Sequence, residues 1–341
     1  MEWTVAIGVD THKRTHLAVA LDRLGRQVGR CEIEATSAGY LELVRFAQSF
    51  GEPAFAVEGA GSYGAGLVRL LRARGLLVYE VERPRRSERR RGKNDLIDAA
   101  RAARRLLSGH GLAAVRGGGQ AREDLRLLLI ERRSAARAEV AARNQLQALL
   151  VTAPCDLRER LNRLAREALL RRCLRLRARH ESERVLVSVL RRLADRIQTL
   201  TREQGELERE IAQIVSALAP ELLAECGVGP ICAAQLIVSS GDATRMRSES
   251  SFAALAGTSP VEASSGPIRR HRLNRGGDRQ LNWALHMITR SRIRFHPETR
   301  AYYERLLASG KSTREAVRCV KRTLARHFYR QLLTNPRLQM T

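Results

Sequence analysis

Apolar residues in the first third of the chain alternate between short runs and helical spacing. The short runs predict five strands, at residues 5–9, 17–21, 28–33, 54–57 and 76–81. Apolar side chains three and four residues apart predict helices at residues 39–50, 62–74 and 95–107. Because strands and helices alternate, residues 1–108 predict an α/β domain with a mixed central sheet.

A helical region follows this domain. Residues 109–120 are rich in glycine and predict a linker, and residues 121–218 are nearly all helix-forming. Apolar residues there recur in alternating steps of four and three, as in a coiled coil. The seam consists of Leu186, Leu190, Leu193, Ile197, Leu200, Gln204, Leu207, Ile211, Ile214 and Leu218. The polar seam residue, Gln204, could fix the register, and the pattern fits both an antiparallel helix pair within the chain and a dimerisation arm.

Residues 219–341 predict a third, mostly helical domain, because Pro220 ends the coiled-coil pattern. Gly227 and Gly229 stand directly before an apolar helix of this domain. A glycine turn of this helix-hairpin-helix-like kind can bind phosphate through backbone N–H groups and the helix N-terminus. An ordinary helix cap is the alternative interpretation of the same residues.

Basic residues outnumber acidic residues by 61 to 36, which gives a net charge of +25. Such an excess favours an anionic partner, and nucleic acid is the first candidate. Residues 161–180 are dense in arginine and could contact a nucleic-acid backbone. Another basic run precedes the helix at 95–107 and consists of Arg85, Arg86, Arg89, Arg90, Arg91 and Lys93. The alternative role of such a run is a solvated surface.

The sequence disfavours several classes of protein. No apolar stretch approaches the roughly 18–20 residues that span a bilayer, and the first residues lack the pattern of a secretory signal. The 6 cysteines are scattered without a CxxC motif, which disfavours a zinc ribbon and a disulfide framework. We therefore expect a cytoplasmic protein with no membrane partner.

Four carboxylates stand where an α/β sheet usually carries its site. Asp10 and Glu58 each follow a predicted core strand, while Asp95 and Asp98 share one face of the next helix. Clustered carboxylates repel each other unless a cation neutralises them, and their hard oxygens suit Mg²⁺ or Mn²⁺. Two such ions can stabilise the attacking and leaving oxygens when a phosphodiester is cleaved. The set therefore favours a metal site for phosphoryl transfer.

Each carboxylate also has a structural interpretation. Asp95 could cap its helix, Asp98 could pair with Arg101 or Arg91, and Glu58 could belong to a turn. It is the joint placement of the acids, with one at the end of the first strand, that favours the metal role over these alternatives.

Several motifs resemble one known family. GVDTHK, VEGAGSYG and KNDLIDA match, in order and spacing, the DEDD blocks of the IS-one-ten (IS110) family of insertion-sequence transposases. Further along, CGVGPICAAQLIVSSGD and FAALAGTSPVEASSGPIRRHRLNRGGDRQLNWAL resemble the C-terminal domain of that family. The resemblance spans nearly the whole chain and rests on two independent groups of motifs.

The resemblance implies a RuvC-like, ribonuclease-H-type fold for the first domain. It implies a site-specific recombinase that moves its own element in the bacterial cytosol, in association with the nucleoid. A structured bridge or seeker RNA would guide it by pairing with double-stranded donor and target DNA. The active protein would be a homo-oligomer, either a dimer or a tetramer.

The resemblance also implies roles for individual residues. The Mg²⁺-binding residues of the family correspond to Asp10, Glu58, Asp95 and Asp98. The nucleophile corresponds to Ser265, with the adjacent Ser264 as the alternative. A serine hydroxyl that attacks a DNA phosphate forms a phosphoserine ester, which stores the bond for rejoining. The basic residues that could hold phosphates nearby are Arg269, Arg270, Arg272 and Arg275.

Two other functions fit the same residues. One is a Holliday-junction-type endonuclease that cuts DNA with metal-activated water and has no use for the serine. The other is a non-catalytic nucleic-acid-binding protein, although clustered negative charge beside the ligand would weaken such binding.

Overall fold

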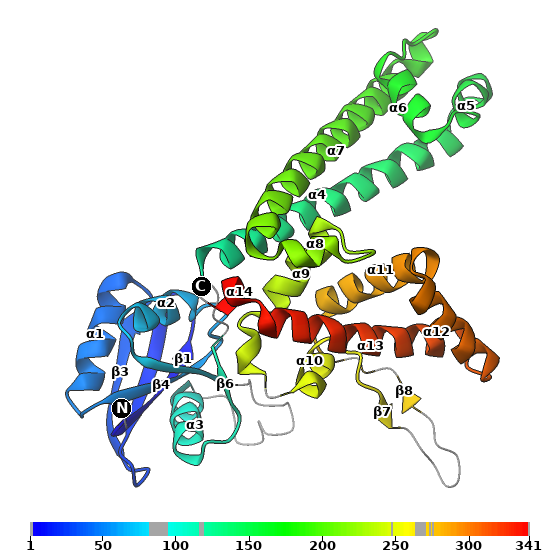
Figure 1. Ribbon diagram of the computed structural model, residues 1–341. Helices are drawn as coiled ribbons and strands as arrows, with labels where there is room; N and C mark the ends of the chain where they lie inside the picture. Colours follow the sequence, from blue (N-terminus) through cyan, green and yellow to red (C-terminus); the bar gives the residue numbers. More distant parts are fainter. Residues whose placement is uncertain are drawn as a thin grey trace. The chain divides into compact units, whose positions relative to one another are not determined.

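A computed structural model describes residues 3–81, 95–115, 119–246, 248–262, 271–272, 274 and 276–339 of the chain. The chain forms two compact units, Met1–Gly117 and Gly118–Thr341 (Figure 1). The helical region and the C-terminal region, which the sequence separates at residue 218, share one hydrophobic core in the second unit.

The described part of the first unit contains a six-stranded sheet with the strand order β3-β2-β1-β4-β5-β6. The strands are Val5–Thr11 (β1), Thr15–Leu21 (β2), Gln27–Glu34 (β3), Pro53–Glu58 (β4), Leu77–Val81 (β5) and Leu112–Ala114 (β6). Strands β1, β4 and β5 run parallel, whereas β2, β3 and β6 are antiparallel to their neighbours. The mixed sheet predicted from the sequence is therefore confirmed.

Strand β6 lies inside the segment 109–120, which the sequence predicts as a linker. Its residues pair antiparallel with Tyr79–Val81 of β5, so this part of the segment belongs to the sheet. The strand has only three residues, and Gly109 and Gly111 before it both adopt positive φ angles. A strand this short, directly after glycines, contains too few residues to show an alternating pattern. It can be recognised only from its pairing with β5.

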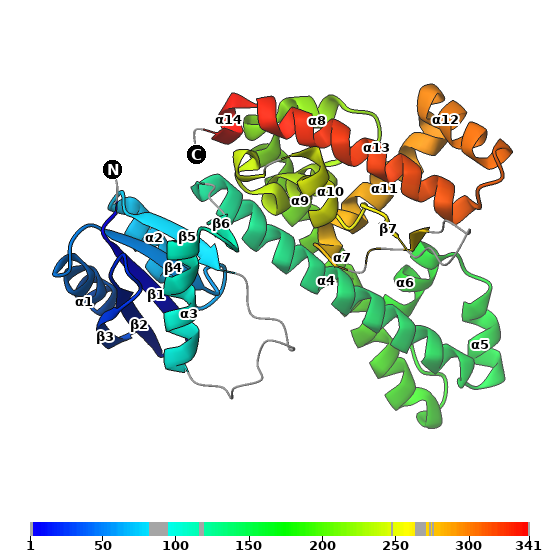
Figure 2. The same ribbon diagram turned by 90° about the horizontal axis from the view of Figure 1, so that it is seen from below.

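Helices cover both faces of this sheet (Figures 1 and 2). The three predicted helices are present as Ser37–Gln48 (α1), Ala65–Ala73 (α2) and Asp95–Ser108 (α3). Helices α1 and α2 cover one face, where Ile7, Val9 and Phe55 are buried. Helix α3 covers the other face, where its alanines pack on alanines of β1 and β4. Every residue of β1 is buried, as expected for a central strand between two helical layers.

Gly8 sets how closely α3 approaches β1. A Cβ atom at this position would lie 2.0 Å from the carbonyl oxygen of Ala99 and 2.3 Å from the backbone nitrogen of Ala103. Those neighbours are backbone atoms, so they cannot move aside as a flexible side chain would. The glycine therefore lets the helix backbone rest directly on the strand, and the small side chains of Ala99 and Ala103 permit the same contact from the helix side.

The second unit begins with a long helical hairpin (Figure 1). Its two arms are Gln120–Val151 (α4) and Arg184–Leu218 (α7), and they pack against each other. Cys155–Asn162 (α5), Arg166–Leu174 (α6) and the short turn Glu181–Glu183 (η2) connect them at the tip. Helix α4 therefore supplies the partner for the predicted seam, and the intramolecular helix pair is the alternative that the structure contains.

The buried residues of α7 follow the predicted seam only in part. Leu190, Ile197, Leu207 and Ile211 are buried as expected, while the other seam residues are partly exposed or packed at the margin. Buried positions outside the seam are Val187, Ala194 and Val215. A straight helix drifts relative to a strict seven-residue repeat, so at these three places the residue directly after a seam residue is buried instead.

A polar layer divides the hairpin into two apolar cores. Gln204 donates a hydrogen bond to Glu139 across the arms, with 3.0 Å between Nε2 and Oε2. Glu139 also accepts a 2.6 Å hydrogen bond from Arg143 on its own helix. Burial disfavours ionisation of Glu139, but these hydrogen bonds and the Arg143 charge outweigh it and lower the pKa of the carboxyl. Because any slip of one arm would leave these groups unpaired, the layer selects one register.

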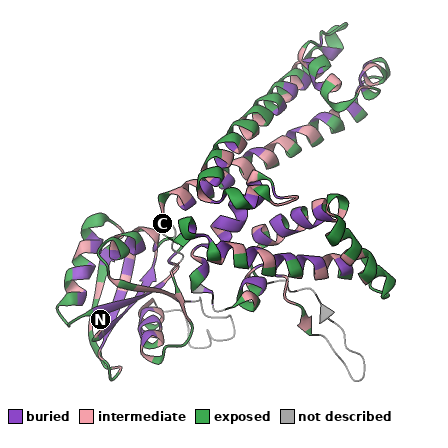
Figure 3. Ribbon diagram, viewed as in Figure 1, coloured by how far each residue is buried: buried purple, intermediate pink, exposed green. Residues whose placement is uncertain are grey.

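The remaining helices of the second unit form one bundle. They are Pro220–Ala224 (α8), Pro230–Ser240 (α9), Glu249–Leu255 (α10), Arg279–Phe295 (α11), Pro297–Ala308 (α12), Thr313–Thr334 (α13) and Pro336–Gln339 (α14). In this bundle α8, α11 and α13 contact α9, α12 packs on α11 and α13, and α10 packs on α13. Helix α9 is buried on nearly all sides and contacts α4, α7 and α11 (Figure 3). A two-stranded ribbon, Val261–Glu262 (β7) and His271–Arg272 (β8), completes the described part of the unit. None of the described helices is long and apolar enough to cross a membrane.

Replacing Gly8 by alanine tests the contact between α3 and β1. We expect Gly8→Ala to lower the free energy of unfolding of the first unit by about 1–3 kcal/mol, because the added methyl group must push the helix backbone away. The measurement is chemical denaturation followed by circular dichroism. Gly61→Ala is the matched control, since a Cβ there meets nothing within 4 Å. Equal stability of the two variants would contradict the packing described above.

Candidate functional site

The sheet and α3 bring acidic residues to one edge. Side chains alternate along a strand, so Asp10 lies on the same face of β1 as Gly8, which contacts α3. Glu58 likewise shares a face of β4 with Ala54 and Ala56, which pack on α3. Strands β1 and β4 are parallel, so Asp10 and Glu58 lie at the same end of neighbouring strands.

Three side chains converge closely at this edge, namely those of Asp10, His12 and Asp95. The Nε2 atom of His12 lies 3.3 Å from Oδ2 of Asp10 and 3.1 Å from Oδ2 of Asp95. One possible ligand atom from each residue falls within 4.8 Å of the others, a spacing that a single metal ion could bridge. The sequence motifs predict Asp10 and Asp95 here and do not predict His12. The signal was present, because a residue two positions after Asp10 points to the same side of an extended chain.

The electrostatics of this cluster favour a bound cation. Asp10 is buried, and its pKa is raised mainly by that burial. The nearby His12 opposes the increase, while the charges of Asp95 and Asp98 add to it. Nε2 of His12 is itself shielded from solvent and makes no hydrogen bond of acceptable geometry to the described residues. A divalent cation would neutralise the carboxylates and could be bound by this nitrogen together with them, so the donor set fits a metal ion.

The other two predicted acids, Asp98 and Glu58, lie near this cluster but make different contacts. Asp98 forms an ion pair with Arg101, with 2.7 Å between Oδ1 and Nη1, which is one of the structural roles that the sequence allows. It is still close enough to Asp10 to influence its pKa. Glu58 is partly exposed, and its backbone carbonyl accepts a 2.7 Å hydrogen bond from the hydroxyl of Thr11. Neither acid belongs to the three-residue cluster.

The glycine turn in the second unit leads into α9. Gly227 has φ +79°, and a Cβ there would lie 2.9 Å from Cβ of Ser291, so the turn requires glycine. Gly229 caps the N-terminus of α9 without a side-chain hydrogen bond, and a Cβ added there would meet nothing within 4 Å. The space beside Gly229 is therefore open, as a phosphate contact there would require.

Glu225 holds this turn against the C-terminal helices. Its carboxylate accepts hydrogen bonds from Arg292 of α11 at 3.0 Å, and from His327 and Gln331 of α13 at 2.8 and 2.6 Å. Burial disfavours ionisation, but the hydrogen bonds and the positive charges of His327 and Arg292 outweigh it and lower the pKa of Glu225. One carboxylate thus connects the turn with two helices that are distant in sequence.

Several predicted site residues lie outside the described residues. These are Arg85, Arg86, Arg89, Arg90, Arg91, Lys93, Ser264, Ser265, Arg269, Arg270 and Arg275. The described chain on either side of the serines is the ribbon of β7 and β8, in which Arg272 pairs with Val261.

The segment after the ribbon is anchored by buried polar groups. Asp278 caps α11, and its other carboxylate oxygen accepts a 2.7 Å hydrogen bond from Ser239 of α9. Asn282 donates to the carbonyl of Ala256 and accepts a 2.6 Å hydrogen bond from the buried Lys321. Burial, reinforced by the charge of Arg318, lowers the pKa of Lys321 to about 8. Lys321 is not predicted from the sequence, because its position in a helix gives no sign that its ammonium group is buried.

Comparisons with known proteins match both ends of the chain to transposases. A family model described as a transposase of the DEDD, IS110 type matches residues 7–153, and it includes the acidic cluster. A second model, described as the transposase IS116/IS110/IS902 family, matches residues 220–304. The two matches occur in the order predicted from the motifs.

Individual relatives agree with these models. The chain is 34% identical over 128 residues to an uncharacterized 43.6 kDa protein of insertion element IS110 from Streptomyces coelicolor. It is 38% identical over 100 residues to a probable family 20 transposase from Pseudomonas aeruginosa. These two matches span about a third of each relative, 32% and 30%. An uncharacterized 42 kDa protein of insertion element IS900 from Mycobacterium paratuberculosis is 26% identical over 94% of both chains.

The network around Glu225 predicts a pH dependence of stability. A carboxyl whose pKa is lowered in the folded state stabilises the fold above its unfolded pKa, and this contribution is lost as the pH falls through the folded value. Stability of the second unit should therefore fall as the pH drops below the ordinary value of 4.5 for a glutamate. Glu225→Gln should be less stable at neutral pH and show a flatter acid limb in denaturation measured across pH.

The exposed Glu210 provides the control for this measurement. Glu210→Gln should leave both the neutral-pH stability and the acid limb close to those of the wild-type protein. An acid limb of Glu225→Gln as steep as that of the control would refute the assigned role of Glu225.

Proposed function

The chain belongs to the IS116/IS110/IS902 family of transposases, and on this premise we propose that it cuts and rejoins DNA strands to move an insertion sequence. Membership of such a family implies phosphoryl transfer on DNA. The observation that carries the proposal is the convergence of Asp10, His12 and Asp95 at one edge of the sheet. An acidic cluster of this kind in a protein of charge +25 suits a metal-assisted reaction on a polyanion.

The metal centre would be held by the chain's own converging donors. Asp10 and Asp95 would supply carboxylate oxygens and His12 an imidazole nitrogen, while Glu58 and Asp98 lie close by on the same face. The carboxylates suit Mg²⁺ or Mn²⁺, and the added nitrogen ligand favours Mn²⁺ of these two. When bound, the ion supplies positive charge that stabilises the oxygens of the reacting phosphate.

The covalent step would belong to the serine pair of the second unit. Oγ of Ser265, or of the adjacent Ser264, would attack the phosphorus of a DNA phosphodiester and lose its proton. The bond from phosphorus to one deoxyribose oxygen would break, and that oxygen would leave as a hydroxyl. Attack of a deoxyribose hydroxyl on the phosphoserine would reverse the step and rejoin a strand. Arg269, Arg270, Arg272 and Arg275 would hold the phosphates around it.

The partners follow from the same proposal. Double-stranded donor and target DNA would be the substrates, and a structured bridge or seeker RNA would select them by base pairing. The basic run at 85–93 and the turn at Gly227 and Gly229 would contact nucleic-acid backbone, which needs no sequence readout. A dimer or tetramer would carry the exchange, because two duplexes have to be cut and rejoined together.

The metal centre makes a prediction about stability. A divalent ion that binds only the folded protein stabilises it by about 2.7 kcal/mol when present at a hundred times its Kd. We expect Mg²⁺ or Mn²⁺ to raise the thermal midpoint of the first unit in the wild-type protein and not in Asp10→Asn.

In the presence of EDTA, the effect of Asp10→Asn on the stability of the fold should be opposite to its effect in the presence of the metal ion. The raised pKa of Asp10 means that folding opposes its ionisation, so the charged group destabilises the metal-free fold as the pH rises through the folded pKa. Asp10→Asn should therefore be at least as stable as the wild-type protein at neutral pH in EDTA. Glu42→Gln, an exposed acid on α1, is the control and should keep the metal response. A metal response that survives in Asp10→Asn would argue against this centre.

The serines make a separate prediction about the reaction. Wild-type protein incubated with Mg²⁺, guide RNA and labelled DNA should form a covalent protein–DNA adduct that survives denaturing electrophoresis. Ser265→Ala should lose the adduct, and Ser264→Ala should keep it. DNA cutting without any adduct would favour the metal-water endonuclease, and DNA binding without cutting would favour the non-catalytic alternative.

A further inference from the structure

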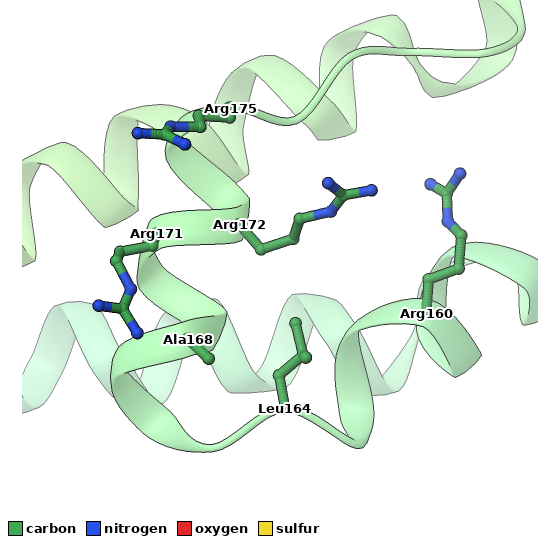
Figure 4. Close-up of a pocket in the computed structure, with 6 residues that line it drawn as sticks. All are labelled: Arg160, Leu164, Ala168, Arg171, Arg172 and Arg175. Carbon is green, nitrogen blue, oxygen red and sulfur yellow. The ribbon is translucent and has the colours of Figure 1, made fainter.

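The tip of the helical hairpin carries an arginine-lined pocket. The pocket has a volume of about 560 Å³ and is lined by Arg160, Leu164, Ala168, Arg171, Arg172 and Arg175 (Figure 4). These residues belong to α5, to α6 and to the ends of these helices. They lie between the ranges 7–153 and 220–304 that the family models match.

Positive charge in this pocket is not balanced by an acid among the described residues. None of the ion pairs in the described part of the chain involves any of the arginines that line it. The guanidinium groups of Arg160 and Arg172 reach toward the same space from facing helices (Figure 4). Nη2 of Arg160 is shielded from solvent and has no hydrogen-bond partner among the described residues. A shielded donor without a partner costs free energy, which a bound anion would recover.

The pocket stands on a packed base. Leu157, Leu161 and Leu170 are buried beneath it, and they pack with Leu190 of α7 in the core of the hairpin tip. The helices that carry the arginines are therefore held in place before any ligand arrives. This matters for binding, because ordering long side chains on mobile helices would reduce the affinity.

The chemistry of the lining identifies the ligand class. A planar guanidinium donates two parallel hydrogen bonds to a phosphate, and several such groups suit a phosphodiester better than a single carboxylate. The lining contains no aromatic side chain on which a base could stack, and its apolar part is limited to Leu164 and Ala168. The pocket is thus suited to the backbone of a nucleic acid and not to its bases.

We propose that this pocket binds a backbone phosphate of the RNA or DNA on which the protein acts, and that the hairpin tip is a sequence-independent nucleic-acid contact. The proposal rests on the proposed function insofar as it assumes a nucleic-acid partner. It adds a binding site in the part of the chain outside both matched ranges, far in sequence from the acidic cluster and from the serines.

The test compares two charge-matched double variants. Arg160→Gln with Arg172→Gln removes the two facing groups of the pocket. Arg191→Gln with Arg196→Gln removes two exposed arginines of α7 in the same hairpin and leaves the pocket unchanged. Binding of a labelled RNA hairpin and of a DNA duplex of the same length is titrated at several salt concentrations in EDTA. Circular dichroism melts establish that both variants are folded.

The pocket variant should bind more weakly at every sequence tested, and its salt dependence should be shallower. Each neutralised phosphate contributes about 1 to the slope of log K against log salt, so losing the one phosphate of this pocket should lower the slope by about 1. The control variant should stay within a slope of about 0.5 of the wild-type protein, because Arg191 and Arg196 do not line the pocket and so leave its phosphate contact in place. Weaker binding confined to the RNA or to the DNA identifies which backbone occupies the pocket.

Other results would overturn the proposal. Equally weakened binding in the two variants would mean that diffuse charge, and not the pocket, binds the backbone. Unchanged affinity and slope in the pocket variant, with normal binding by the wild-type protein, would reject the pocket and leave the proposed function intact. If the pocket variant instead changed only the oligomeric state in light scattering, the pocket would be a protein contact. Failure of the wild-type protein to bind either probe would count against the proposed function itself.

Discussion

The acidic site depends on one close backbone contact. Helix α3 rests directly on β1 because Gly8 has no side chain, and this contact brings the first turn of the helix beside the end of the strand. Asp95 thereby reaches the neighbourhood of Asp10 and His12. The alanines of α3 serve the same purpose from the other side, since larger residues would lift the helix and separate the acids.

Acidic and basic side chains gather in two separate clusters, and the two clusters would bind different ligands. The chain has a net charge of +25, yet its acids converge at one edge of the sheet, where burial and mutual repulsion raise the pKa of Asp10. At the hairpin tip the opposite occurs, because Arg160 and Arg172 approach each other without an acid between them. Each cluster would be stabilised by a ligand of opposite charge, a divalent cation in the first and a phosphate in the second.

The hairpin shows how a long arm acquires a single structure. Apolar contacts between α4 and α7 supply most of the driving force, but they would tolerate a shift by one turn. The pairing of Gln204 with Glu139 would not, because it joins particular positions of the two helices. The register of the arm in turn fixes where α5 and α6 stand at the tip, and so the placement of the arginines.

Features that depend on local periodicity and on motifs were predictable from the sequence. It predicted the five longer strands, the helices of the first unit, the long arm and the transposase family, because each leaves a repeated pattern or a matching block. Four features emerge from the folded chain alone: α4 is the partner of α7, Leu112–Ala114 joins the sheet, His12 lies between two acids, and Lys321 is buried. These features arise from contacts between residues far apart in the chain or at turns. Periodicity records which face of an element is buried, and it does not record which neighbour buries it.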